Sequence, residues 1–203
     1  MAAGRVGIGV SNVYVAAYAN NSGTVSYSSG VRLGRLVDVA FSLDDSGDNN
    51  FYADNVAAES AGPIFTGGTM DIEIDGLLEA VEKFVFGLED RTAVTVGTNT
   101  SIAMYGDGAN SVPPYVGIGF IVSEMEDGVT TYKPIIIRKG RFQKSVRDAH
   151  TKEEAIDWQT QTLTAQLYRD DTANHDWRQF GENCATEADA EAVIKSVLGI
   201  TGA

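Results

Sequence analysis

The sequence predicts an α+β protein that is mainly β, with an antiparallel β-sandwich or barrel-like sheet system and two short helices packed on it. Two observations carry this prediction. Apolar and polar residues alternate along several segments, and two other segments place apolar residues at helical spacing. The 203 residues suit a single domain, residues 1–203, which is long enough to bury a sizeable core.

Strand signals recur along the chain. In "TMDIEID" (69–75), Met70, Ile72 and Ile74 share one face and three acidic residues share the other. Residues 115–139 predict a hairpin, because alternating apolar residues lead into Asp127-Gly128, a dipeptide typical of tight turns.

Two further strands are predicted, at residues 155–168 and 13–19. The first carries a threonine series on one face, together with Ile156 and Trp158. The second lies in "RVGIGVSNVYVAAYAN", which also resembles a signal peptide with a cleavage-like Ala-Tyr-Ala. Polar residues interrupt its apolar run, which favours the strand.

Two segments predict helices. "GLLEAVEKFVFGL" (76–88) carries apolar residues at helical spacing, and Gly87 is a candidate terminator. "TEADAEAVIKSVLGI" (186–200) begins with Thr186 as a candidate N-cap, has acidic residues in its first turn, and reaches Gly199 at its end.

Loops are predicted at "LDDSGDNN" (43–50) and at residues 96–114, because Gly, Asn, Asp and Pro supply turn geometry. The first lacks the ligand spacing of a calcium loop, so a turn is the preferred interpretation. The second is long enough to suggest a functional loop.

Charge is unevenly distributed. The net charge is −13, yet residues 131–152 hold seven of the fifteen Lys and Arg residues and one acid, so this stretch is formally +6 and the remainder −19. The overall charge argues against general binding to nucleic acid or to an anionic membrane. No apolar run reaches the roughly 20 residues that cross a bilayer.

Catalytic and metal-binding patterns are scarce. His150 and His175 have no neighbour at metal-ligand spacing, and Cys184, the single cysteine, has no partner for an intrachain disulfide, which fits a reducing compartment. The acidic row of residues 71, 73 and 75 suits a solvated strand face better than a cation site. The sequence therefore predicts a protein that is not an enzyme and has no cofactor.

Several stretches together resemble one family. "FYADNVAAESAGPIFTGGTMDIEIDGLLEAVEKFVFGL" is similar to the central part of the major tail proteins, or tail tube proteins, of bacteriophages with long non-contractile tails. "PPYVGIGFIVSE", "IIIRKGRF" and "EEAIDWQTQTLTAQLYRD" then follow in the order of that family. The resemblance extends from about Val37 to Leu198.

This resemblance implies a structural virion protein. Its subunits would form hexameric rings that stack into a hollow tube, through which viral DNA passes without specific binding. The tube would surround a tape-measure protein and contact distal tail and tail terminator proteins, with no membrane contact. The protein would assemble in the host cytoplasm and reside in the virion tail.

Under this hypothesis, the basic stretch would meet acidic surface on a neighbouring subunit, because complementary charge sets register and specificity. Residues 38–59 offer such a surface, with six acids and no Lys or Arg. The candidate intersubunit contacts are Lys133, Arg138, Lys139, Arg141, Lys144, Arg147, Asp44, Asp45 and Asp48. The plainer interpretation is a solvated charged face.

Two other functions fit the same sequence. One is a β-sandwich adhesion or binding module, monomeric or in a small oligomer, with exposed loop aromatics such as Tyr105 and Tyr115. The other is a nucleic-acid binder that uses the basic stretch, which the acidic remainder of the chain disfavours.

Overall fold

The fold is taken from a computed structural model that describes residues 4–53, 56–97, 100–144 and 159–201. Two helices and twelve strands are present in these ranges. The helices are α1 (Glu79–Phe86) and α2 (Glu187–Val197). The strands are β1 (Val6–Asn21), β2 (Thr24–Gly34), β3 (Leu36–Asp45), β4 (Asn49–Ala53), β5 (Val56–Ala61), β6 (Phe65–Ile74), β7 (Glu89–Val96), β8 (Thr100–Gly106), β9 (Val116–Glu126), β10 (Val129–Phe142), β11 (Gln161–Tyr168) and β12 (Arg178–Phe180).

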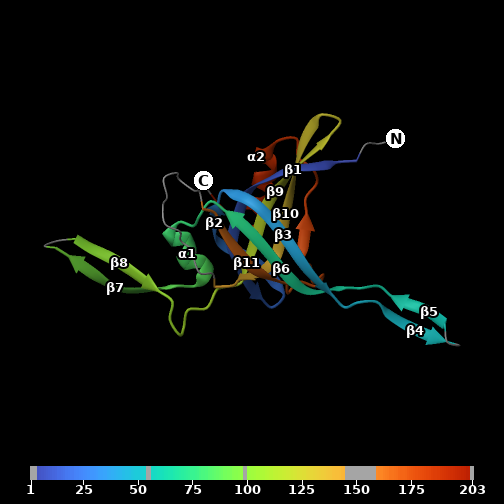
Figure 1. The fold of residues 1–203 in the computed structure, drawn as a ribbon, viewed down its shortest axis with the longest axis horizontal. Helices are drawn as coiled ribbons and strands as arrows, with labels where there is room; N and C mark the ends of the chain where they lie inside the picture. Colours follow the sequence, from blue (N-terminus) through green and yellow to red (C-terminus); the bar gives the residue numbers. More distant parts are fainter. Residues whose placement is uncertain (1–3, 54–55, 98–99, 145–158, 202–203) are drawn as a thin grey trace.

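The main sheet curls round until its two ends meet. Its strand order is β2-β1-β9-β10-β11-β6-β3, with β12 added beside β10, and every pairing is antiparallel. The outermost strands, β2 and β3, are separated in the chain by Arg35 alone. Gly34 at the end of β2 pairs with Val13, and Leu36 at the start of β3 pairs with Ile74. The chain therefore passes from one end of the sheet to the other at Arg35. The result is a barrel-like closure (Figure 1). The predicted class, mainly β with an antiparallel sheet and two helices, is confirmed.

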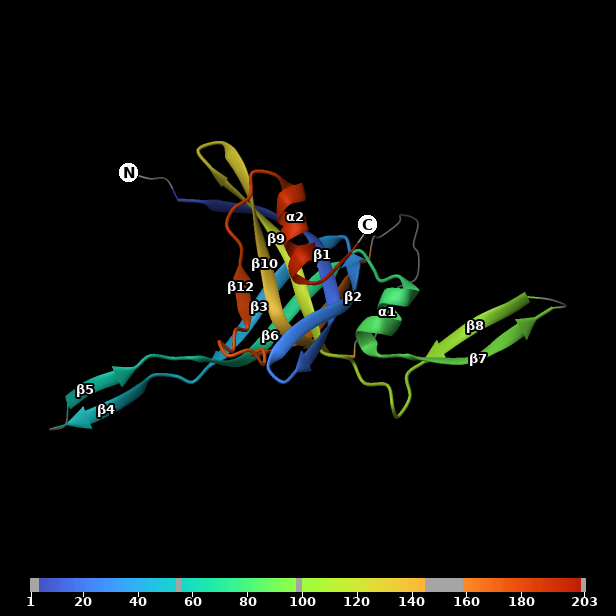
Figure 2. The ribbon, with the colours of Figure 1, turned by 180° about the vertical axis from the view of Figure 1, so that it is seen from behind.

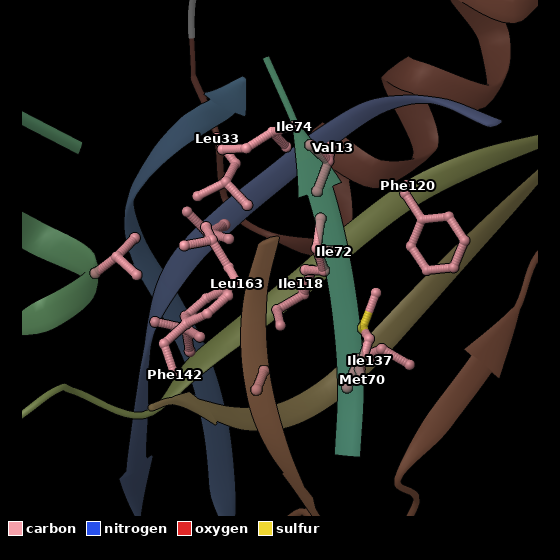
Figure 3. Packing of buried hydrophobic residues seen from close by; sticks show 14 of the residues in the cluster. Val13, Leu33, Met70, Ile72, Ile74, Ile118, Phe120, Ile137, Phe142 and Leu163 are labelled. Carbon is pink, nitrogen blue, oxygen red and sulfur yellow. The ribbon is translucent and has the colours of Figure 1, made fainter. Parts of the chain in front are cut away.

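Along β6, successive side chains point alternately to the inside and to the outside of this barrel. Met70, Ile72 and Ile74 are fully buried, and Ile72 lies between Val39 and Leu163 on the neighbouring strands. These side chains belong to one cluster that collects residues from β1, β2, β6, β9, β10, β11 and α1 (Figure 3). The predicted alternation of residues 69–75 is confirmed.

The other predicted strands are also present. β9 and β10 form the expected hairpin, with Asp127 and Gly128 at φ values of 50° and 82°, the left-handed pair that a type I′ turn requires. β1 contains residues 13–19. β11 covers residues 161–168 of the predicted 155–168, while residues 155–158 lie outside the described residues.

Both predicted helices are confirmed, with caps at the expected positions. Gly87 ends α1 in the left-handed conformation, and the Thr186 hydroxyl accepts a hydrogen bond from the Asp189 backbone N–H at the start of α2. α1 contributes to the interior cluster. α2 lies outside the barrel, where its residues pack against Tyr14, Ile121 and others on β1, β9 and β10.

Two glycines of β9 make room for α2. A Cβ atom on Gly119 would lie 2.5 Å from Cγ2 of Ile194, and one on Gly117 would lie 2.9 Å from Cδ2 of Leu198. Such separations are too short for carbon atoms, so the alternation "VGIGF" gives β9 an apolar inner face and a smooth outer groove for the helix.

Two hairpins leave the barrel as extended arms in opposite directions (Figures 1 and 2). One consists of β4 and β5, and the other of β7 and β8. The loops predicted at residues 43–50 and 96–114 are therefore shorter than expected. Residues 100–106 form β8, because their β-branched side chains pair with the similar run on β7.

We predict that Gly119→Ala destabilises the fold by about 1–3 kcal/mol, because the added methyl group overlaps Ile194 and displaces α2. Thermal and urea unfolding measure the change. Gly7→Ala is the matched control, since no atom lies within 4 Å of its added Cβ. Equal unfolding midpoints for the two variants would contradict this view of the groove.

Candidate interaction surfaces

Within the basic stretch, Arg138 is held inside the subunit. Its Nε donates to Oδ2 of Asp170 at 3.0 Å, and the Asp170 side chain is fully buried. The Thr172 hydroxyl donates to the second oxygen of Asp170, while the Arg138 guanidinium lies 5.4 Å from the centre of the Tyr27 ring. Burial raises the pKa of Tyr27 above its ordinary value, and its hydroxyl donates to the Arg138 carbonyl. This network fixes residues 169–177 to β10.

Lys139 makes a second internal network beside the first. Its Nζ donates to Asp171 at 2.7 Å and lies about 5 Å from the rings of both Tyr18 and Tyr115. The hydrogen bonds from Lys139 and then Tyr18 hold the pKa of Asp171 below its usual value. Burial, with the hydrogen bond to Asp171, raises the pKa of Tyr18 to about 12. The cation, the carboxylate and the phenols therefore stabilise one another.

The other described basic residues of the stretch differ in their surroundings. Arg141 lies 3.9 Å from the centre of the Tyr115 ring, and its Nε is buried without a hydrogen-bond partner. Lys144 is exposed and pairs with Asp107. Lys133 lies 5.1 Å from the centre of the Phe180 ring. Arg147 lies outside the described residues.

These contacts within one subunit account for most of the positive charge in the basic stretch, so a neighbouring subunit is not needed to explain it. Reversing Arg138, Lys139 and Arg141 together would leave Asp170 buried beside like charge, so that change tests the fold before it tests assembly. Lys133 and Lys144 are better probes of an intersubunit contact, which stays a prediction.

The acidic candidates lie where β3 leaves the barrel for the β4–β5 arm. Asp44, Asp45 and Asp48 are exposed. Asp45 accepts a hydrogen bond from the Gly47 backbone N–H, and Gly47 has the positive φ of a turn, as the turn interpretation of this segment predicts. Asp44 and Asp48 carry their charge into solvent near the root of the arm.

Both arms expose apolar side chains. On the β7–β8 arm, Val94, Ile102 and Met104 are 43–50% exposed, and residues 92–106 contain no charged residue. On the β4–β5 arm, Phe51 is 64% exposed beside a hollow of about 410 Å³ that it lines together with Glu59. A lone subunit gains nothing from such exposure, and free strand edges favour association.

The outer face of β3, β6 and β11 is polar and acidic. Asp38 lies directly opposite Glu73, and Asp71 accepts a hydrogen bond of 2.6 Å from the Thr164 hydroxyl. Like charges opposite one another on a sheet destabilise it, so stability alone does not account for this pair. The three strands contain no Lys or Arg. Neither helix packs on this face, since α2 covers β1, β9 and β10 and α1 joins the interior cluster.

The cation-site alternative for residues 71, 73 and 75 finds little support in the geometry. Asp75 binds Arg35 through both carboxylate oxygens, and the hydrogen bond from the Arg35 backbone N–H lowers the pKa of Asp75. Glu73 accepts from the Thr160 hydroxyl. Among the described residues, no three His, Cys, Asp or Glu side chains are grouped so that they could hold a metal ion.

The aromatic candidates of the adhesion hypothesis have partners within the subunit. The Tyr105 hydroxyl donates to Glu82 at 3.1 Å, and the Tyr115 ring packs edge-on against Tyr168 at 5.5 Å. Neither ring is a free aromatic at a loop tip.

An aromatic and cationic cluster around β12 was missed by the sequence reasoning. Arg178 lies 4.3 Å from the centre of the Trp177 ring and 4.4 Å from that of Phe180, and Trp177 stacks on Phe65 at 4.5 Å. The only local signal was "DWRQF", in which two aromatic residues flank an arginine. The contribution of Phe65 depends on a contact between distant strands.

Comparison with protein-family models gives no match for this sequence, and comparison with curated proteins gives none either. No helix among the described residues is long and apolar enough to cross a membrane.

We predict that Arg138→Met lowers the free energy of unfolding by about 3–5 kcal/mol, because Asp170 would remain buried without its counter-charge. Urea unfolding at neutral pH measures the loss. The control is Lys144→Met, whose exposed ion pair should change stability by at most about 0.5–1 kcal/mol. If the two variants lost the same free energy of unfolding, the Arg138–Asp170 pair would not be more important for stability than an exposed ion pair.

Proposed function

We propose that this chain is a structural virion protein whose copies form stacked hexameric rings, and that the resulting tail tube conducts viral DNA into the host. The resemblance to tail tube proteins supplies the hexamer, the tape-measure, distal tail and terminator partners, and the location in the virion tail after assembly in the host cytoplasm. The single observation that carries the proposal is the pair of arms that leave a barrel-like sheet in opposite directions.

The arms supply contacts that a ring or a stack needs. Each arm is a two-stranded hairpin with an open edge on either side, and among the described residues the outer edges of β2 and β3 also lack a hydrogen-bonded neighbouring strand. Because the arms project in opposite directions, each copy can reach two others (Figure 2). A contact between different surfaces of identical copies is heterologous, and it closes into a ring or continues as a stack.

The acidic outer face of β3, β6 and β11 is our candidate for the channel lining. Its rows of carboxylates and hydroxyls, Asp38–Glu73–Thr162 and Asp71–Thr164, offer no cation to duplex phosphates. A basic lining would retain DNA by releasing its counterions, whereas an acidic one lets the duplex slide. The same face lacks a covering helix, as a channel wall requires.

The proposal is tested by negative-stain electron microscopy of the purified protein over a concentration series. We expect six-fold rings or hollow tubes. Val94→Thr with Ile102→Thr should raise the concentration at which they form by about tenfold or more, because apolar contact area is lost.

The control for the arm variant is Val193→Thr on α2, which removes a similarly exposed apolar group from another surface. Unchanged assembly in the arm variant would contradict a role for the β7–β8 arm. Wild-type protein that stays monomeric at every concentration, even when virion tail components are added as initiators, would overturn the proposed function.

We also predict that Asp38→Lys with Asp71→Lys gives tubes that retain duplex DNA at low salt and release it as salt rises, because the lining becomes cationic. Retention of linear DNA by purified tubes measures this. Glu79→Lys with Glu182→Lys is the control, since it makes the same charge change away from this face. Equal retention in both variants would place the channel elsewhere.

A further inference from the structure

Three cations and an exposed aromatic ring gather beside the root of the β4–β5 arm. We call Lys133, Arg169, Arg178 and Phe180 the cationic platform. Lys133 and Arg178 both lie against the ring of Phe180, which is 52% exposed. Arg169 donates to the carbonyl of Phe65, whose ring stacks on Trp177, and Trp177 in turn packs against Arg178. A chain of contacts through Phe65 and Trp177 therefore links all four residues of the platform.

The cations of the platform lack counter-charges. In the described part of the chain, none of Lys133, Arg169 and Arg178 forms an ion pair, whereas Arg138, Lys139 and Lys144 all do. Arg178 is half-buried among rings, and that burial lowers the pKa of its guanidinium. The nearest acid in sequence, Asp176, accepts a hydrogen bond from Gln179 instead. Lys133 and Arg178 are partly buried and Arg169 is exposed. Such a group of cations without carboxylates forms a receptor for an acidic partner.

The same chain carries an acidic segment that fits this receptor. Residues 36–82 contain no Lys or Arg. Within them, the root and body of the β4–β5 arm, which we call the acidic arm, expose Asp44, Asp48 and Glu59. Phe51 adds an apolar contact of the kind that Phe180 can use.

We propose that the acidic arm of one copy docks on the cationic platform of a second copy. This inference rests on the proposed assembly into rings, and it names the surfaces that make one of its contacts. Carboxylates of the arm approach the three unpaired cations, while Phe51 and Phe180 bury apolar area at the centre of the contact.

A second copy fits this surface better than the arm of the same copy. Arg178 lies 6.0 Å from the centre of the Phe41 ring on β3, so the platform lies where the arm begins. The arm then extends away from the barrel and carries its tip to a distant point (Figure 2). Asp44 lies beside the platform of its own copy, whereas the arm carries Asp48, Phe51 and Glu59 away from it. These three residues can therefore meet the platform of a second copy in a repeating heterologous contact.

The test reverses each surface separately and then mixes the products. The platform variant is Lys133→Glu with Arg169→Glu, which keeps Arg178 in its packing. The arm variant is Asp48→Lys with Glu59→Lys, which spares the turn contact of Asp45. We expect each variant alone to self-associate about tenfold or more weakly than wild type in low salt. Sedimentation velocity over a concentration series measures this.

An equimolar mixture of the two variants should recover association, because a native arm then meets a native platform and a reversed arm meets a reversed platform. Arg5→Glu with Arg32→Glu is the matched control, since these exposed cations lie away from the platform, and it should associate like wild type. Thermal unfolding checks that all variants remain folded.

The outcomes separate this inference from the proposed function. If wild type associates and either variant alone matches it, or if the mixture does not recover, the docking inference is wrong and the assembly proposal stands. If the platform variant keeps its association and instead loses binding to added duplex DNA, the platform is a phosphate site. If neither wild type nor the mixture associates, both proposals fail.

Discussion

The architecture depends on one covalent constraint, the single residue that joins β2 to β3. Because Arg35 alone separates the two outermost strands of the main sheet, the sheet must close on itself. Asp75 secures the corner by accepting from both the backbone and the side chain of Arg35. Closure creates an interior that side chains from seven elements fill.

Closure also gives the outside of the barrel two different faces. Over β1, β9 and β10, the glycines of β9 let α2 approach closely and bury a second apolar cluster. Over β3, β6 and β11, carboxylates and hydroxyls remain in solvent. One sheet thus combines a packed face, which contributes stability, with an acidic face that retains like charges at a cost to stability. The difference between these faces is what makes a channel lining a reasonable assignment for the second.

The gathering of positive charge in residues 131–152 has a largely internal explanation. Arg138 and Lys139 neutralise Asp170 and Asp171, and tyrosine rings cover the cations. Such pairs are costly to break, because either partner alone would be a charge with poor access to water. Among the described residues, Lys133 of this stretch forms no ion pair and lies with Arg169 and Arg178 around β12, where the three cations are available to a partner. Charge in sequence and charge on the surface are therefore different distributions in this protein.

The sequence by itself determined the elements whose signal is local. These are the alternation of residues 69–75, the Asp127-Gly128 turn, the end of α1 at Gly87 and the start of α2 at Thr186. Side-chain periodicity and turn chemistry act over a few residues, so they can be recognised without a fold. The tertiary structure alone decided which charges are paired, that residues 100–106 form half of an arm, and that Phe65 completes the cluster around Arg178. These facts depend on contacts between segments that are distant in the sequence. Whether a residue is buried or paired there is set by the position of the other segment, which local patterns do not encode.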